Sequence, residues 1–219
     1  MRNSTKLNYN EQKDRVPYAA GEFYLQKVES FKHKGNLTYS IVLKEKEIGK
    51  VEETDKESIS FSNSLLKVLS LFFINLKGVI VEALELNLLD QDGQLIANIR
   101  KKAGFFSDLK VYTKSNEHLA TLNFSTKKNT PVISVISSES NDQYAVWVKS
   151  NLMDFSIESK QTGKEIFTIK KRSLVHSTIR KNLTDNDAFF IDNTQLDSKV
   201  FIKLISVVVA LDIYYYIGQ

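Results

Sequence analysis

The fold is decided by the apolar run Val200–Ile217, which reads VFIKLISVVVALDIYYYI. Taken as a helix, the part Leu204–Leu211 is apolar on every side apart from Ser206. The charges that flank it, Lys203 and Asp212, fall on opposite faces at about 100° per residue. No polar stripe is left to face water, so either a membrane or the rest of the protein must surround this helix.

The length of the run favours burial inside the protein. A membrane-spanning helix needs about 20 mainly apolar residues, and the charge-free part between Lys203 and Asp212 is less than half as long. Each of these charges would cost about 2.5–3.5 kcal/mol in hydrocarbon. Asp197 is placed to cap the N-terminus and Gly218 to follow the C-terminus. We therefore expect a helix at about 197–217 inside a shell; a C-terminal membrane anchor is the alternative.

Composition indicates what kind of protein forms the shell. The chain has 219 residues, of which 42% are hydrophobic, enough for a core. It has no cysteine, which excludes disulfides, a thiol nucleophile and a thiolate metal site. Residues 1–15 are polar and contain no signal-peptide core. We expect a cytosolic, bacterial protein with a polar tail at 1–20 and one domain at 21–219.

The body of the chain reads as extended runs joined by polar turns. The run 84–88 alternates and leads through Asp90–Gly93, a turn that favours hairpins, into the run 95–99. Repeated short hairpins predict an antiparallel sheet, and closure into a barrel leaves no exposed edge. Outside the C-terminal run, only 64–76 reads as a long helix. The other hairpins pair 38–42 with 48–51, 109–113 with 119–124, and 155–159 with 166–169.

Two hairpins end in lysine pairs, at Ile99–Lys102 and Ile169–Arg172, and the run Tyr144–Val148 leads into Asp154–Glu158. Together with Val207–Asp212, the most specific piece, they resemble the tubby C-terminal-like superfamily. The branch concerned contains the LURP-one-related and phospholipid scramblase domains. The resemblance implies an antiparallel barrel of about twelve strands threaded by a hydrophobic C-terminal helix. It implies a fold rather than a function, and this chain lacks the palmitoylated cysteines of scramblases.

Residues typical of catalytic or metal sites form no recognisable constellation in the sequence. The turn at Asp90–Gly93 resembles the start of a calcium loop, but Lys101 stands where that loop needs a glutamate. The histidines have no metal-ligand spacing to one another; they are His33, His118 and His176. We expect a non-catalytic protein without metal or cofactor.

Basic residues at the hairpin ends are the first candidate site. If the hairpins lie side by side, these residues cluster at one rim and attract anionic headgroups, at about 1 kcal/mol for each Lys or Arg. The alternative is solvated hairpin ends. A pI near 9.0 favours a polyanionic partner slightly, and nucleic acid is disfavoured because aromatics are not interleaved with the basic runs. The set comprises Arg100, Lys101, Lys102, Lys170, Lys171, Arg172, Arg180 and Lys181.

The apolar segment Leu65–Leu76 is the second candidate site. It is either an interfacial helix that contacts a membrane or a core element of the barrel. Two functions follow. The first is a non-catalytic barrel that binds anionic phospholipid headgroups at the inner membrane surface. The second is a soluble interaction or structural module that uses this segment to hold a protein partner. The contact residues are Leu65, Leu66, Leu69, Phe72 and Phe73.

Overall fold

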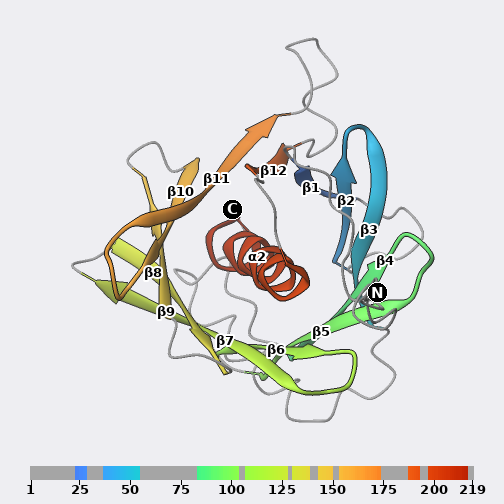
Figure 1. Cartoon of the computed structure of the whole chain (residues 1–219), viewed down its shortest axis with the longest axis horizontal. Helices are drawn as coiled ribbons and strands as arrows, with labels where there is room; N and C mark the ends of the chain where they lie inside the picture. Colours follow the sequence, from blue (N-terminus) through green and yellow to red (C-terminus); the bar gives the residue numbers. More distant parts are fainter. Residues whose placement is uncertain are drawn as a thin grey trace, which may run out of the picture.

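A computed structural model of the chain describes residues 23–28, 37–54, 83–103, 107–127, 130–138, 143–149, 153–173, 187–192 and 197–216. In this part of the chain, twelve strands form a closed antiparallel barrel, and a C-terminal helix lies at the centre of the ring (Figure 1). The predicted fold, a barrel of about twelve strands that encloses a hydrophobic helix, is confirmed.

The strands pair in the order in which the chain makes them. Each strand is hydrogen-bonded to the next, and β12 returns to pair with β1, so the ring closes without an unpaired edge. The four predicted hairpins are β2–β3, β4–β5, β6–β7 and β10–β11. The bounds are β1 Phe23–Lys27, β2 Thr38–Leu43, β3 Lys46–Glu53, β4 Leu84–Asp90, β5 Leu95–Lys101, β6 Leu109–Thr113, β7 His118–Lys127, β8 Thr130–Ser137, β9 Gln143–Val148, β10 Asp154–Ser159, β11 Glu165–Ser173 and β12 Asp187–Ile191.

The central helix follows the predicted bounds closely. It comprises α2 (Ser198–Leu211) and a π-helical turn, η3 (Asp212–Tyr216). The carboxylate of Asp197 accepts a hydrogen bond from the backbone N–H of Val200 at 2.8 Å, which is the predicted N-cap. The predicted C-terminal residue Gly218 lies outside the described residues.

The hydrophobic core consists of the central helix and the strand residues that pack around it. Every residue from Leu204 to Leu211 is buried, as the all-round apolar pattern predicted. Alternate strand residues point inward to meet the helix, and ring contacts such as Phe23 with Phe201, 5.4 Å apart, join wall to helix. No helix in the described part of the chain is long and apolar enough to span a membrane.

The two ends of the barrel differ in the connections that meet there. Because all strands are antiparallel, every odd-numbered strand finishes at the same end. We call this end, where β1, β5 and β11 finish at Lys27, Lys101 and Ser173, the lysine end. The opposite end carries the short turns β2–β3, β4–β5 and β10–β11, and we call it the turn end. At the turn end, Gly93 and Gly163 adopt positive φ angles of 77° and 66°, as tight turns favour.

The helix runs from the turn end to the lysine end. Near its start, the Nζ of Lys203 donates to the hydroxyl of Ser137, the last residue of β8, at 2.9 Å. Near its finish, Asp212 accepts a hydrogen bond from Tyr39, the second residue of β2. The C-terminal part of the helix is therefore placed among the strand ends that carry the lysines.

Candidate functional site

The lysine end carries charged side chains inside the barrel as well as outside it. Successive strand residues alternate between the two faces, and several strands carry a charged residue at an inward position near this end. These positions are Lys27 on β1, Glu53 on β3, Lys101 on β5 and Lys171 on β11, and each continues an inward row of apolar residues. The lysine end is thus lined from within by three cations and one carboxylate, which the carboxylate of Asp212 joins.

Asp212 is the centre of the inward charges. The hydroxyl of Tyr39 donates to its Oδ2 at 2.7 Å, and the Nζ of Lys27 lies 3.6 Å from the same oxygen. Burial, with the nearby Asp212 carboxylate as a further cause, raises the pKa of Tyr39 well above its ordinary value. Tyr39 therefore stays a neutral donor, and the network ties β1 and β2 to the end of α2.

Lys101 and Lys171 are buried on the inner face. Burial lowers the pKa of Lys101 to about 8, and its Nζ donates to the carbonyl of Lys102 at 3.3 Å. The Nζ of Lys171 lies 5.7 Å from the ring centre of Phe189, its cross-strand neighbour on β12, in a cation–π contact. Both residues were predicted as part of an exposed basic rim, and for them that interpretation is wrong. Each lies two residues after a buried isoleucine, Ile99 or Ile169, and therefore on the same inner face of its strand.

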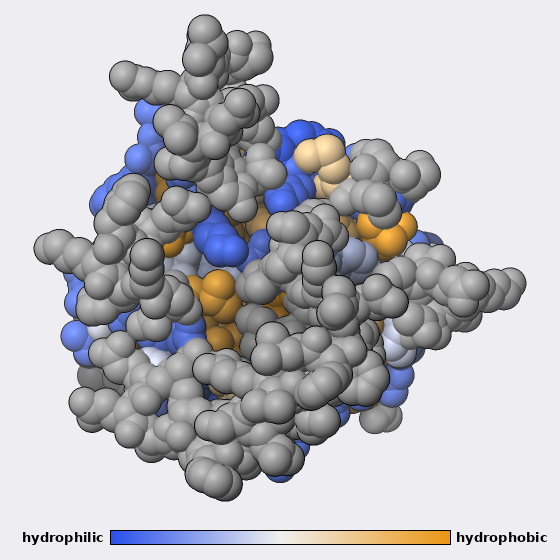
Figure 2. Space-filling model, turned by 180° about the vertical axis from the view of Figure 1, so that it is seen from behind, coloured by the Kyte–Doolittle hydropathy of each residue, from blue (hydrophilic) through white to orange (hydrophobic). Residues whose placement is uncertain are grey.

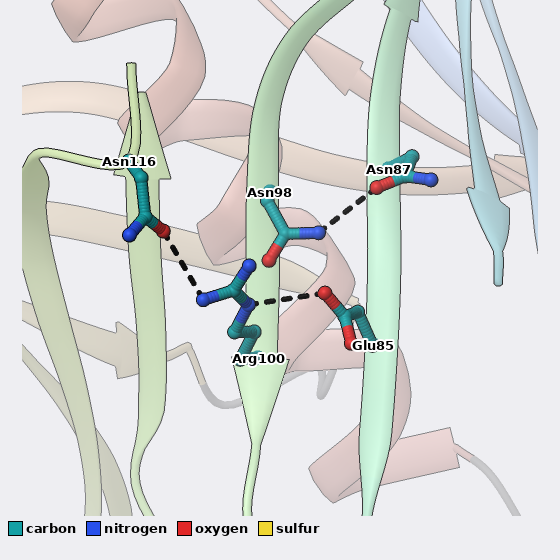
Figure 3. A network of polar contacts seen from close by, with 5 residues as sticks. All are labelled: Glu85, Asn87, Asn98, Arg100 and Asn116. Atoms are coloured by element: carbon teal, nitrogen blue, oxygen red, sulfur yellow. Dashed lines mark hydrogen bonds and ion pairs between the residues drawn. The ribbon is translucent and has the colours of Figure 1, made fainter. Parts of the chain in front are cut away.

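The outward basic residues divide into paired and unpaired ones. Arg100 donates to Glu85 at 3.0 Å and to Asn116 at 3.2 Å, beside a hydrogen bond between Asn98 and Asn87 (Figure 3). Arg172 lies 2.6 Å from a carboxylate oxygen of Asp154. By contrast, Lys102 and Lys170 are exposed, and no ion pair of either is seen within the described ranges.

The two basic runs share the lysine end but do not lie side by side. β5 and β11 are six steps apart around a ring of twelve strands, so they occupy opposite sides of the barrel. The premise that these hairpins are neighbours is wrong, because the chain places each strand beside the next and sets β6 to β10 between them. Arg180 and Lys181, in the connection from β11 to β12, lie outside the described residues.

The apolar candidate Leu65–Leu76, with Leu65, Leu66, Leu69, Phe72 and Phe73, also lies outside the described residues. What the structure gives is where the chain leaves and re-enters the barrel. The N–H of Thr54, directly after β3, donates to the carbonyl of Glu85 near the start of β4 at 2.9 Å. Both ends of this connection therefore meet at the lysine end.

The π-helical turn η3 also contacts the barrel wall away from β1 and β2, through two tyrosines. The hydroxyl of Tyr214 donates to the carbonyl of Ser107, between β5 and β6, at 2.7 Å, and burial raises its pKa to about 12. The Tyr214 ring stacks on Phe124 with centres 4.7 Å apart, and Tyr215 meets Phe155 edge-on at 5.6 Å. Aromatic side chains thus hold the helix end on one side and the Asp212 network on the other.

In the described part of the chain, no group of three or more His, Asp and Glu side chains could hold a metal ion. Viewed from the back of Figure 1, hydrophobic residues show near the middle of the face, with hydrophilic ones around them (Figure 2). Asp212 and Tyr39 were not identified as site residues from the sequence, because they are 173 positions apart and neither belongs to a motif.

Comparison with known proteins supports the fold. No family model matches the chain, and neither does any curated protein. The chain is similar to the X-ray structure of a protein from Arabidopsis thaliana (AT5G01750), with a TM-score of 0.51 and 15% sequence identity. The match covers 91% of this chain and 93% of that chain. At this identity the likeness shows a shared barrel architecture, and membership of the tubby-like superfamily stays a prediction.

Proposed function

We propose that the protein is a non-catalytic β-barrel module that binds anionic phospholipid headgroups at the inner membrane surface with its lysine end. The observation that carries the proposal is the gathering of basic strand ends at one end of the barrel. β1, β5 and β11 all finish there, with Lys27, Arg100, Lys101, Lys102, Lys170, Lys171 and Arg172.

The charges available to a headgroup are those that the protein does not neutralise. Lys102 and Lys170 are exposed on opposite sides of this end, whereas Arg100 and Arg172 have carboxylate partners. Each Lys or Arg near an anionic bilayer contributes about 1 kcal/mol. The two lysines, for which no ion pair is seen among the described residues, therefore give weak, salt-sensitive binding together with the inner lysines behind them. Weak binding of this kind is typical of a peripheral module.

The test is co-sedimentation with vesicles of phosphatidylcholine alone and of phosphatidylcholine with phosphatidylserine. We expect binding to the anionic vesicles only, weakening as salt rises. Lys102→Glu with Lys170→Glu is expected to abolish it. The matched control is Lys160→Glu with Lys164→Glu, which makes the same charge change on exposed residues of the turn end.

Two results would overturn the proposal. One is wild-type binding that is equal for neutral and anionic vesicles, and the other is equal loss in the two double variants. Absence of vesicle binding would favour the second function, an interaction module for a protein partner. For that module, Phe72→Asp is expected to abolish association with the partner or with a second copy of the chain.

A further inference from the structure

The outer wall of the barrel is not uniform around the lysine end. On one side, Tyr24 of β1 lies opposite Phe190 of β12, and Phe190 lies opposite Lys170 of β11. The two rings are 5.1 Å apart, and both residues are half-buried on the outer face. Two aromatic side chains and an exposed lysine therefore form one continuous row across three strands.

Exposed apolar side chains lie at both borders of this row. Val28 directly follows β1 and is 42% exposed, and Met153 directly precedes β10 and is 41% exposed. The carbonyl of Met153 accepts a hydrogen bond from the N–H of Lys171 at 2.7 Å, which fixes it beside β11. We call Val28, Tyr24, Phe190, Lys170 and Met153 the aromatic wall.

The opposite side of the barrel has the reverse character. β6 lies six steps from β12 in the ring, and the outward residues of β4 to β6 are mainly polar. Arg100 donates to both Glu85 and Asn116, and Asn98 donates to Asn87 (Figure 3). Arg100 also lies 5.0 Å from the ring centre of Tyr112. The guanidinium of Arg100 and the carboxylate of Glu85 are therefore already paired within this side.

We propose that the lysine end meets an anionic bilayer at a tilt, with the aromatic wall and the adjoining ends of β11, β12 and β1 against the lipid. The inference rests on the proposed function, and it names the surface and the orientation of that binding. Amphipathic aromatic side chains such as tyrosine are favoured at the level of the lipid headgroups, because one end of the ring is apolar and the other is polar. A lysine beside them keeps its ammonium among the phosphates while its stem covers apolar surface.

A bilayer fits this surface better than an anionic protein does. Tyr24, Phe190 and Lys170 lie on the convex outer face of the barrel, and Val28 and Met153 lie at its rim. A convex surface that combines exposed apolar side chains with one exposed lysine matches a flat, layered partner, in which phosphates lie above acyl chains. An acidic peptide would need several cations in register.

The absence of cysteine from the chain allows a direct test. Single cysteines replace Met153, Val28 and, as the matched control, Lys110, which is exposed on β6 near the same end of the barrel but on the opposite side. Each variant of the full chain carries an environment-sensitive nitrobenzoxadiazole label and is mixed with phosphatidylserine-containing vesicles. We expect a blue shift and brighter emission from the labels at 153 and 28 and no change at 110.

A charge test accompanies the labels. Lys170→Ala is expected to lower the affinity for these vesicles about fivefold, the change that corresponds to one interfacial lysine. Lys110→Ala is expected to leave the affinity unchanged. These exposed lysines can be replaced without disturbing the core, and circular dichroism checks that each variant is folded.

The outcomes separate the inference from the proposed function. If the label at 110 responds as strongly as those at 153 and 28, the barrel docks end-on and the inference is overturned while lipid binding stands. If only the label at 110 responds, the polar side docks on the bilayer. The inference is then overturned as well, while lipid binding stands. If the wild-type chain ignores anionic vesicles and Lys170→Ala instead weakens capture of a protein partner, both proposals are overturned.

Discussion

The barrel interior changes character along the central helix. Around Leu204–Leu211, the inward strand residues are apolar and every helix residue is buried. We call these residues the apolar layers. Toward the lysine end, the same inward rows continue with a charged layer, formed by Asp212 of the helix and by Lys27, Glu53, Lys101 and Lys171. Apolar burial stabilises in proportion to the area removed from water, whereas buried charges stabilise little and depend on their partners. The apolar layers therefore hold the fold, and the charged layer contributes little to its stability.

The largest expected effect breaks the apolar layers. Phe201→Ala removes a fully buried ring that packs on Phe23, and a substitution of this kind costs about 3–5 kcal/mol because it leaves a cavity. The matched control is Phe190→Ala on the outer wall, where the ring is half-buried and its loss leaves no enclosed cavity.

Urea denaturation followed by circular dichroism measures both variants. We expect a much lower midpoint for Phe201→Ala with little change in slope. Equal losses for the two phenylalanines would show that the layers around the helix are no more important than the outer wall.

A smaller effect is expected where the charged layer begins. Tyr39→Phe removes the hydroxyl that donates to the buried carboxylate of Asp212. A hydrogen bond to a charged group contributes about 1.5–3 kcal/mol to stability. Tyr24→Phe is the control, since no hydrogen bond of the Tyr24 hydroxyl is seen among the described residues.

A double-mutant cycle sharpens this prediction. If the Tyr39–Asp212 bond accounts for the loss, Tyr39→Phe is expected to cost clearly less in the background of Asp212→Asn than in the wild type. Additive losses would mean that the hydroxyl and the carboxylate stabilise the protein independently, and that the network does not tie β2 to the helix end.

The apolar layers were predictable from the sequence because their signals are local. The all-round apolar pattern of Leu204–Leu211 predicted burial, and Gly93 and Gly163 predicted two of the hairpin turns. Strands β1, β8 and β12 were not identified from their residues, and the pairing of β1 with β12, which closes the ring, joins segments far apart in the sequence and has no local signal.

The charged layer was harder to predict because its signal is weak. Lys101 follows Ala97 and Ile99 at a period of two, so alternation alone assigns it to the inner face. Treating Arg100, Lys101 and Lys102 as one basic block hid that signal. The contact of Asp212 with Tyr39 has no local signal at all, because it depends on how the helix threads the ring.

The smallest expected effect concerns one buried cation of the charged layer. Burial lowers the pKa of Lys101 to about 8 from an ordinary value of 10.5. Between these values the unfolded chain keeps a proton that the folded chain has released, so the contribution of Lys101 to stability rises with pH across this window. Below pH 8 the buried ammonium is charged and opposes folding.

Lys101→Met removes that charge among Leu84 and Leu109, its cross-strand neighbours. At pH 7 we expect the variant to melt about 2–4 °C above the wild type, which corresponds to roughly 1 kcal/mol in a chain of this size. This is well below what the pKa shift alone suggests, because solvent at the barrel end screens the charge. The difference is expected to shrink toward pH 10, and Lys102→Met, on an exposed residue, is expected to show none at any pH. A gap that stays constant from pH 7 to pH 10 would mean that packing, rather than the buried charge, sets the stability of this layer.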